Sequence, residues 1–293
     1  MLISDRILPV TLLSFGLGLT SAYAFDGRKS PDSIPEIPGV GAVVRPPAPL
    51  DGGGPTHAME FHPGNLTPAL KVVEDAFNKG DAVAGWKLGR MFADGIGGVD
   101  RNPVRAFHYF RAVYLRASSE NQDDELVMPE VRLVLADASV QLGLYYLKGI
   151  PNSEIKADAI RAYNIFDYAA SILGDADAQF YLGRMYLEGQ GVAKEPKLAV
   201  KWFYQAATRG QYEAQVRYGT LLIEGKLVAR DVPKGLMWLK IAAETAPEGE
   251  ARDAVRGIYT SAIDQATKDE RGTGDVYFER WKLARQKPAP AGK

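Results

Sequence analysis

The chain has 293 residues, of which 46% are apolar and 24% are charged, so it is long enough to bury a sizeable core. Its formal net charge of -1 lacks the strongly basic balance of nucleic-acid-binding proteins, and we expect no nucleic acid among its partners. The absence of cysteine excludes disulfides, thiolate catalysis and cysteine-ligated metal sites. Stability must therefore come from packing.

The first 24 residues have the pattern of a secretory signal peptide. Arg6 precedes an apolar run, Ile7–Leu19, and the small residues after it predict cleavage between Ala24 and Phe25. The run is shorter than the ~20 residues that a membrane-spanning helix needs, although an uncleaved anchor is the alternative. We therefore expect a periplasmic protein that does not insert directly into the membrane after cleavage.

Residues 25–65 are rich in proline and glycine and show almost no apolar periodicity, which predicts a disordered tail. The tail is either a spacer or an extended segment that a partner recognises. His57 and His62 lie in it without a third ligand or a helix, which is poor spacing for a metal site. We expect no metal and no other cofactor. Residues 288–293 are also predicted to be disordered.

The clearest organising feature is an internal repeat with a period of 36 residues. Two consecutive segments, 174–210 and 210–246, carry identical residues at equivalent positions: Gly183 and Gly219, Trp202 and Trp238, Ala206 and Ala242. Two less regular copies precede them at about 80–117 and 136–174. Apolar residues recur at helical spacing on both sides of a glycine-rich turn, so each unit is predicted to be a pair of amphipathic helices. In the third unit Gly189 or Gly191 is expected to end the first helix, and Pro196 to begin the second.

A glycine recurs inside the first helix of every unit, although glycine there costs roughly 1 kcal/mol relative to alanine. These landmark glycines are Gly89, Gly143, Gly183 and Gly219. We expect them to let a neighbouring helix approach closely. The alanine pairs of the second helices provide a similarly shallow surface: Ala206 and Ala207 in the third unit, Ala242 and Ala243 in the fourth. With Trp202 and Trp238, these residues form the predicted repeat-packing set.

The first two units are separated by an insertion at roughly 118–135. It opens with an acidic run that contains Glu120, Asp123, Asp124 and Glu125, and its second half is expected to extend the next helix. Insertions in repeat arrays often lie on the binding face, so these acids are candidate partner-binding residues, with a solvated loop as the alternative. Tyr181 and Tyr204 lie off the buried stripes and are candidate anchors for a peptide, with core packing as the alternative.

Both ends of the array are predicted to be helical caps. Residues 66–79 look like half a repeat that begins at Pro68, with a buried stripe formed by Ala69, Val72, Val73, Ala76 and Phe77. Residues 247–287 are predicted to form two capping helices, a charged one up to about Lys268 and an amphipathic one from Asp275, separated by a break at Gly272–Gly274.

The pattern A-x-x-x-L-G-x-x-Y-x-x-G-x-G-V, followed by A-x-x-W-x-x-x-A-A-x-x-G, resembles the Sel-like repeat, a relative of the tetratricopeptide repeat. The third unit matches every position. The others depart at a few landmarks: Tyr109 and Ile165 replace the tryptophan of the first two units, and in the fourth unit Tyr218 replaces the leucine and Gly235 the first alanine of the second helix. Stacked helix pairs of this kind imply an all-α fold, a right-handed α-solenoid with helical caps over residues 66–246 and 247–287.

The whole layout is similar to that of a family of periplasmic negative regulators of exopolysaccharide synthesis in rhizobia and related bacteria. That similarity implies a regulator that binds the periplasmic region of a membrane sensor kinase, represses its two-component signalling and is removed by a periplasmic protease. An envelope scaffold or chaperone-like adaptor without kinase control is the alternative. An enzyme is disfavoured, because the sequence shows no catalytic constellation.

Overall fold

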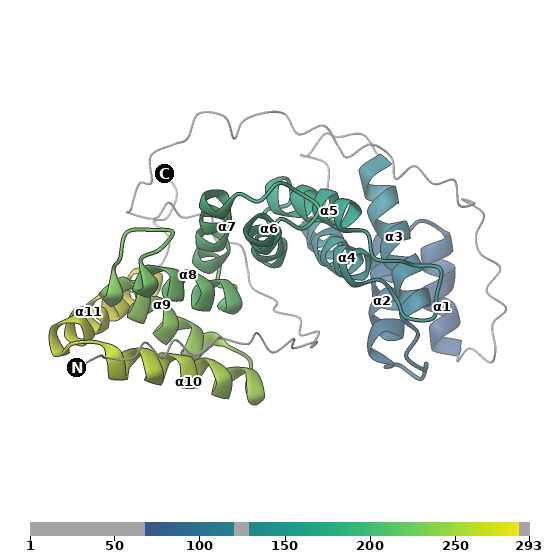
Figure 1. Ribbon diagram of the computed structural model, residues 1–293. Helices are drawn as coiled ribbons and strands as arrows, with labels where there is room; N and C mark the ends of the chain where they lie inside the picture. Colours follow the sequence, from purple (N-terminus) through teal and green to yellow (C-terminus); the bar gives the residue numbers. More distant parts are fainter. Residues whose placement is uncertain (1–67, 120–128, 287–293) are drawn as a thin grey trace, which may run out of the picture.

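The computed structural model describes residues 68–119 and 129–286, and this part of the chain folds into eleven α-helices without a strand. The helices are α1 (Pro68–Asn78), α2 (Ala82–Asp94), α3 (Pro103–Ser119), α4 (Pro129–Lys148), α5 (Ala159–Ser171), α6 (Ala176–Glu188), α7 (Pro196–Thr208), α8 (Tyr212–Glu224), α9 (Val232–Thr245), α10 (Glu250–Gln265) and α11 (Lys268–Gln286). Figure 1 shows them following one another along an arch, with α1 at one end and α10 and α11 at the other. The predicted all-α solenoid is confirmed.

Each repeat unit is a helix pair in which a glycine lies against a large apolar side chain. The pairs are α2–α3, α4–α5, α6–α7 and α8–α9. A Cβ placed on the landmark glycine would lie within 3 Å of an aromatic ring in three units: Gly89 faces Phe110 at 2.5 Å, Gly143 faces Phe166 at 2.7 Å and Gly183 faces Phe203 at 2.8 Å. Any side chain at these positions would push the two helices apart, which explains the glycines.

The fourth unit uses the same contact with different chemistry. A Cβ on Gly219 would lie 2.9 Å from the carbonyl oxygen of Gly235 and 3.2 Å from Cγ of Leu239. Leu239 occupies the position of Phe203, and the second glycine lets the two backbones approach directly. The close approach therefore persists without an aromatic ring.

The alanine pairs make a different contact from the landmark glycines. Ala206 and Ala207 are fully buried, but they lie at the end of α7, where the next unit begins. The carbonyl of Ala206 accepts from the backbone N–H of Gln211 at 3.1 Å, and that of Ala207 accepts from Nε2 of Gln215 at 3.1 Å. The alanine pairs therefore lie at the contact between successive units. The residue that faces the landmark glycine is the one after the tryptophan, Phe203 in the third unit.

The ends of the helices follow the predicted chemistry. In the third unit Gly189 ends α6 with φ 76° and ψ 34°, and Pro196 is the first residue of α7. The left-handed conformation of Gly189 is open to glycine at no steric cost. Asp175 caps α6 by accepting from the N–H of Ala178 at 2.8 Å.

Two arginine side chains donate to backbone carbonyls at the C-terminal ends of neighbouring helices. Arg116 on α3 donates to the carbonyl of Phe77 at 2.8 Å, and Arg132 on α4 donates to that of Ile172 at 2.6 Å. Such donors satisfy carbonyls that have no partner within their own helix. They also fix neighbouring elements to one another, because the guanidinium stays charged at all ordinary pH values.

The N-terminal cap begins at Pro68, and its predicted buried stripe is correct only in part: Val73 and Phe77 are half-buried against the main core. Leu70 is its only fully buried residue, whereas Val72 is 69% exposed and Ala69 is also exposed. The helix has no partner helix of its own, so only the side that faces the first unit is packed: it lies on α2, and the ring of Phe77 meets the edge of Tyr109 on α3. The insertion extends α4 as expected, since α4 has 20 residues where α2 and α6 have 13.

The C-terminal cap contains two helices, but the predicted break at Gly272–Gly274 is wrong. α11 runs from Lys268 through both glycines to Gln286. Its start is set by Thr267, whose hydroxyl accepts from the N–H of Glu270, while the carboxylate of Glu270 accepts from the N–H of Thr267. This capping box places the start of the helix before the glycines. Among the described helices, none is long and apolar enough to cross a bilayer.

Candidate partner-binding surface

An acidic residue stands six positions before the landmark glycine in three consecutive units. These residues are Asp137 on α4, Asp177 on α6 and Glu213 on α8, and the first unit has Val83 at the same position. Equivalent positions of stacked helices face the same side of an array, so the three acids form one line, which we call the carboxylate row. The helices that carry it, α4, α6 and α8, lie along the middle part of the arch (Figure 1).

The row is surrounded by hydrogen-bond donors and by one further acid. Nε1 of Trp86, on α2, donates to Oδ2 of Asp137 at 2.5 Å. The side-chain amide of Gln211, just before α8, donates to Oε2 of Glu213. The further acid is Asp175, the N-cap residue of α6, which lies two residues before Asp177. Together with the three row residues, Asp175 brings four carboxylates to this part of the array.

Burial and mutual repulsion shift Asp175, Asp177 and Glu213 toward their neutral forms. Burial and, to a smaller extent, the charge of Asp177 together raise the pKa of Asp175 to about 7. Burial also raises the pKa of Asp177, against the opposing effect of a hydrogen bond from Gln211. Burial also raises the pKa of Glu213. None of these acids forms an ion pair with another of the described residues.

Two arginines lie beside the row on the same helices. Nε of Arg184, on α6, is 3.6 Å from a carboxylate oxygen of Glu188, one turn further along. The pKa of Arg217, on α8, is lowered by burial and by the charge of Arg184. The surface is thus polarised: carboxylates lie toward the helix starts, and closely spaced guanidinium groups lie one to two turns beyond.

The aromatic candidates Tyr181 and Tyr204 both lie at seams between units and are partly exposed. Tyr181 stacks on Phe166 of α5, with ring centroids 5.1 Å apart, and Tyr204 meets the edge of Tyr218 on α8 at 5.3 Å. Tyr181 is also close to the row, since Asp177 and Glu213 contribute to the raised pKa of its hydroxyl after burial. Their proposed role as peptide anchors stays a prediction.

The other predicted residues divide into two groups. The packing residues Trp202, Trp238, Ala242 and Ala243 lie in the interior or at its edge, with Trp238 and both alanines buried. The acidic run with Glu120, Asp123, Asp124 and Glu125, and the cleavage residues Ala24 and Phe25, lie outside the described residues. They stay predictions.

Sequence reasoning missed the carboxylate row, although the signal was available. Aligning the four units on their landmark glycines places Asp137, Asp177 and Glu213 in one column. The bond from Trp86 to Asp137 could not have been found in this way, because it joins first helices of different units across the insertion.

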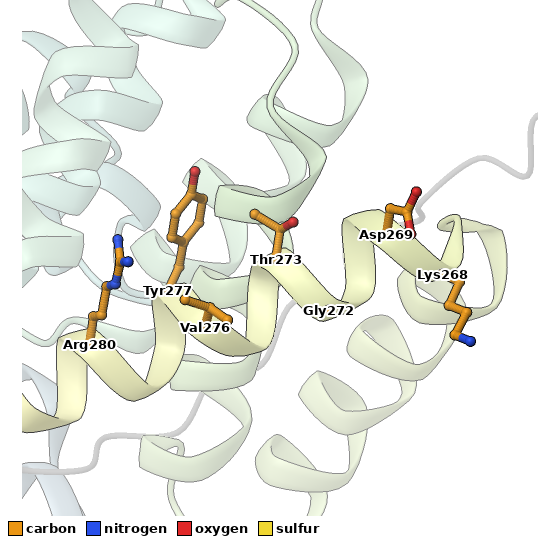
Figure 2. A pocket seen from close by; sticks show the side chains of 7 residues that line it. All are labelled: Lys268, Asp269, Gly272, Thr273, Val276, Tyr277 and Arg280. Atoms are coloured by element: carbon orange, nitrogen blue, oxygen red, sulfur yellow. The ribbon is translucent and has the colours of Figure 1, made fainter.

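The surface of α11 carries a hollow of about 610 Å³, whose described lining residues all come from that helix (Figure 2). They include Asp269, Thr273, Val276, Tyr277 and Arg280. Side chains of one helix diverge from its axis, so they do not converge on a bound group. In the described ranges, 68–119 and 129–286, no group of three or more histidine, aspartate or glutamate side chains is suited to hold a metal ion.

The family model described as Sel1 repeat matches four segments of the chain, residues 82–112, 136–171, 176–211 and 213–244. These segments coincide with the four helix pairs. Among solved structures, a Sel1 repeat protein from Oxalobacter formigenes is 25% identical, with a TM-score of 0.52 over 74% of this chain and 78% of that one.

Two curated relatives carry the name exopolysaccharide production negative regulator. The protein from Rhizobium meliloti (strain 1021) is 30% identical over 146 residues, which is 50% of this chain and 52% of the relative. The protein from Rhizobium leguminosarum bv. viciae is 30% identical over 143 residues, 49% of this chain and 51% of the relative. The match thus spans about half the length of these relatives.

Proposed function

Because this chain belongs to the Sel1 repeat family, we propose that it works by binding another protein, as a negative regulator of exopolysaccharide production, and that it is not an enzyme. The observation that carries the proposal is the 30% identity to two rhizobial proteins of that name. The fold adds a scaffold of stacked helix pairs, which offers an extended surface to a partner.

The partner that we propose is the periplasmic region of a membrane sensor kinase, whose two-component signalling the bound chain would hold off. The signal-peptide pattern of residues 1–24 supports export to the compartment where that region lies. Binding would restrain the kinase only if the chain prefers its inactive form, since a ligand shifts an equilibrium by its difference in affinity for the two states.

The contact surface that we propose is the face with the carboxylate row and Tyr181. Partly desolvated acids attract a basic side chain of a partner more strongly than exposed acids do. Tyr181 adds an aromatic surface held in place by Phe166, and rigid aromatic side chains often dominate interface energetics. Arg184 and Arg217 would reject a partner that places its cation too far along the helices.

Deletion of the gene tests the function in the cell. We expect more exopolysaccharide in the deletion strain, and restoration when the full chain is supplied. Unchanged exopolysaccharide in the deletion strain would rule out the proposed regulation. Capture of membrane proteins by the mature chain should enrich one sensor kinase, whereas recovery of many envelope proteins with unaltered kinase output would favour a scaffold or adaptor.

Paired substitutions test the surface. The variant Asp177→Asn with Glu213→Gln removes two row charges and should weaken kinase capture about tenfold or more, since interface charges contribute roughly 1.4 kcal/mol or more when desolvated. The matched control is Asp253→Asn with Asp264→Asn, which removes two exposed acids from α10. Equal capture by both double variants would contradict the assignment of the surface while leaving the regulatory function untouched.

A further inference from the structure

α10 and α11 do not form a fifth helix pair, although only Ala266 and Thr267 separate them. Both pack on α9 and make little contact with each other. Gly257 on α10 has no atom within 4 Å of the place where a Cβ would lie. The covered glycine is Gly274 on α11, where a Cβ would lie 3.1 Å from the carbonyl oxygen of Pro233 and 3.3 Å from Cβ of Leu236. α11 therefore docks on α9 instead of on α10.

Two ion pairs and one cation–π contact join α11 to the fourth unit, in addition to the close packing of Gly274 on α9. Glu270, in its first turn, lies 3.5 Å from Arg230, just before α9. Asp275 lies 2.7 Å from Nζ of Lys240 on α9. The same ammonium group stands 4.5 Å from the ring centroid of Phe278. Partly exposed pairs of this kind are individually weak and are screened by salt.

Only one large side chain of α11 is fully buried. Phe278 is 1% exposed and belongs to the main apolar core, with Trp281 packed beside it. Val276 and Leu283 are exposed. By comparison, α9 buries eight residues along 14 positions. The attachment of α11 thus combines a single apolar anchor with several ionic contacts.

The far end of α11 reaches a different unit. Nη2 of Arg285 donates to the carbonyl oxygen of Thr208, the last residue of α7, at 3.0 Å. α7 belongs to the third unit and α9 to the fourth, so one helix is fastened to both. Because the curvature of a solenoid is set by the small rotation between successive units, a helix fixed at both places fixes that rotation.

We propose that α11 is a releasable strap: docked, it holds the third and fourth units at one angle, and its release by rising ionic strength leaves both helix pairs folded but free to rotate. The strap is a two-state element of the kind that controls binding surfaces through their shape. The carboxylate row crosses both units, so its residues Asp177 and Glu213 would move relative to one another on release. The strap itself does not depend on the identity of the partner.

Hydrogen exchange of the full mature chain tests release. At about 0.5 M salt the amides of α11 should exchange about tenfold faster than at about 0.05 M, while those of α8 and α9 stay equally protected. Lys240→Glu should give the fast exchange of α11 already at low salt, and adding Asp275→Lys should restore protection. The control Lys197→Glu makes the same charge change on α7, away from α11. Equal protection of α11 and α9 at both salt concentrations would overturn the proposal.

An engineered disulfide tests whether α11 docks on α9 through Gly274. The wild-type chain contains no cysteine, and the Cβ positions of Leu236 and Gly274 are 3.3 Å apart, close to the spacing of a disulfide. The oxidised form of the double variant Leu236→Cys, Gly274→Cys can therefore be compared with its reduced form. Oxidation should abolish the salt-dependent exchange of α11, and salt-dependent exchange that persists in the oxidised form would contradict docking through this contact.

Spin labels on the third and fourth units report the angle itself. Glu188 on α6 and Glu224 on α8 are both exposed and suit substitution by cysteine. In the labelled Glu188→Cys, Glu224→Cys chain, the distribution of distances should be narrow at low salt and broaden at high salt or with Lys240→Glu. A distribution that stays narrow while α11 exchanges rapidly would show that α11 does not set the angle.

Discussion

The third unit and the C-terminal cap are both pairs of consecutive helices, yet their helices choose different neighbours. In the third unit α6 and α7 pack on each other, with Gly183 against Phe203. In the cap α10 and α11 both pack on α9, and Gly274 is the glycine that is covered. Helical pattern and short connections are common to both regions. The difference is therefore decided by where a glycine meets a large side chain.

Removing the ring of Phe203 from its contact with Gly183 should have the largest effect on stability. Phe203 is fully buried, so Phe203→Ala should lower the free energy of unfolding by about 3–5 kcal/mol, as measured by urea denaturation. Phe278→Ala in the cap should have a smaller effect, because α11 can undock while the repeats stay folded. Hydrogen exchange should then show fast amides in α11 alone. Equal losses of stability in the two variants would remove the distinction between unit and cap.

The N-cap of the third unit should give the next largest effect, through pH. Because the pKa of Asp175 in the folded chain is raised to about 7, this acid is protonated there at about pH 5, whereas the unfolded chain is already ionised. Its contribution to stability is present at low pH and is lost as the pH rises through 7. Asp175→Asn keeps a capping oxygen without the charge, so it should melt well above the wild type at about pH 8, and the difference should shrink steadily as the pH falls toward about 4.

Thermal melts of the two chains between these pH values provide the measurement. The difference between wild type and Asp175→Asn isolates this group from Asp177 and Glu213, whose pKa values are also raised by burial. Parallel pH dependences for both proteins would show that Asp175 is not protonated in the folded chain at neutral pH.

Adding one methyl group to the unit should have a moderate effect. The Cβ of Gly183→Ala would lie 2.8 Å from the ring of Phe203, so we expect a loss of about 1–3 kcal/mol in the free energy of unfolding. Combining it with Phe203→Leu should recover part of the loss, since Gly219 already faces a leucine in the fourth unit. A double variant whose loss equals the sum of the single losses would show that the ring is not the obstacle.

The same addition in the cap should have the smallest effect and the opposite sign. Gly257 lies inside α10 with open space around its Cβ position, so Gly257→Ala should raise the free energy of unfolding by about 0.5–1 kcal/mol through helix propensity alone. A loss of stability would mean that α10 is covered at this position in solution.

Most of the fold was accessible from the sequence because its local signals agree. Gly189 and Pro196 mark helix ends in ways that depend on a few neighbouring residues, and the structure follows them. The sequence did not predict that both cap helices pack on α9, because Gly257 and Gly274 look alike in sequence. The break placed at Gly272–Gly274 overlooked the pairing of Thr267 with Glu270, a local signal that outweighs helix propensity.

The candidate surface was less accessible than the fold. The column formed by Asp137, Asp177 and Glu213 could be found from the repeat register, but its burial and the bond from Trp86 depend on how units stack. Tyr181 was identified as lying off the buried stripe, and it is partly exposed, yet its stacking on Phe166 required the neighbouring unit. Residues at seams between units are therefore where sequence reasoning loses information.

The contact between a landmark glycine and its ring is made entirely within one unit, between positions about twenty residues apart, as in Gly183 and Phe203. Chains whose contacts are close in sequence lose little entropy in closing them and fold quickly. Each hairpin of helices can therefore consolidate before the next one is complete. A gene that gains or loses one such 36-residue module would leave the remaining hairpins with their own contacts, so the length of this array is open to change by duplication.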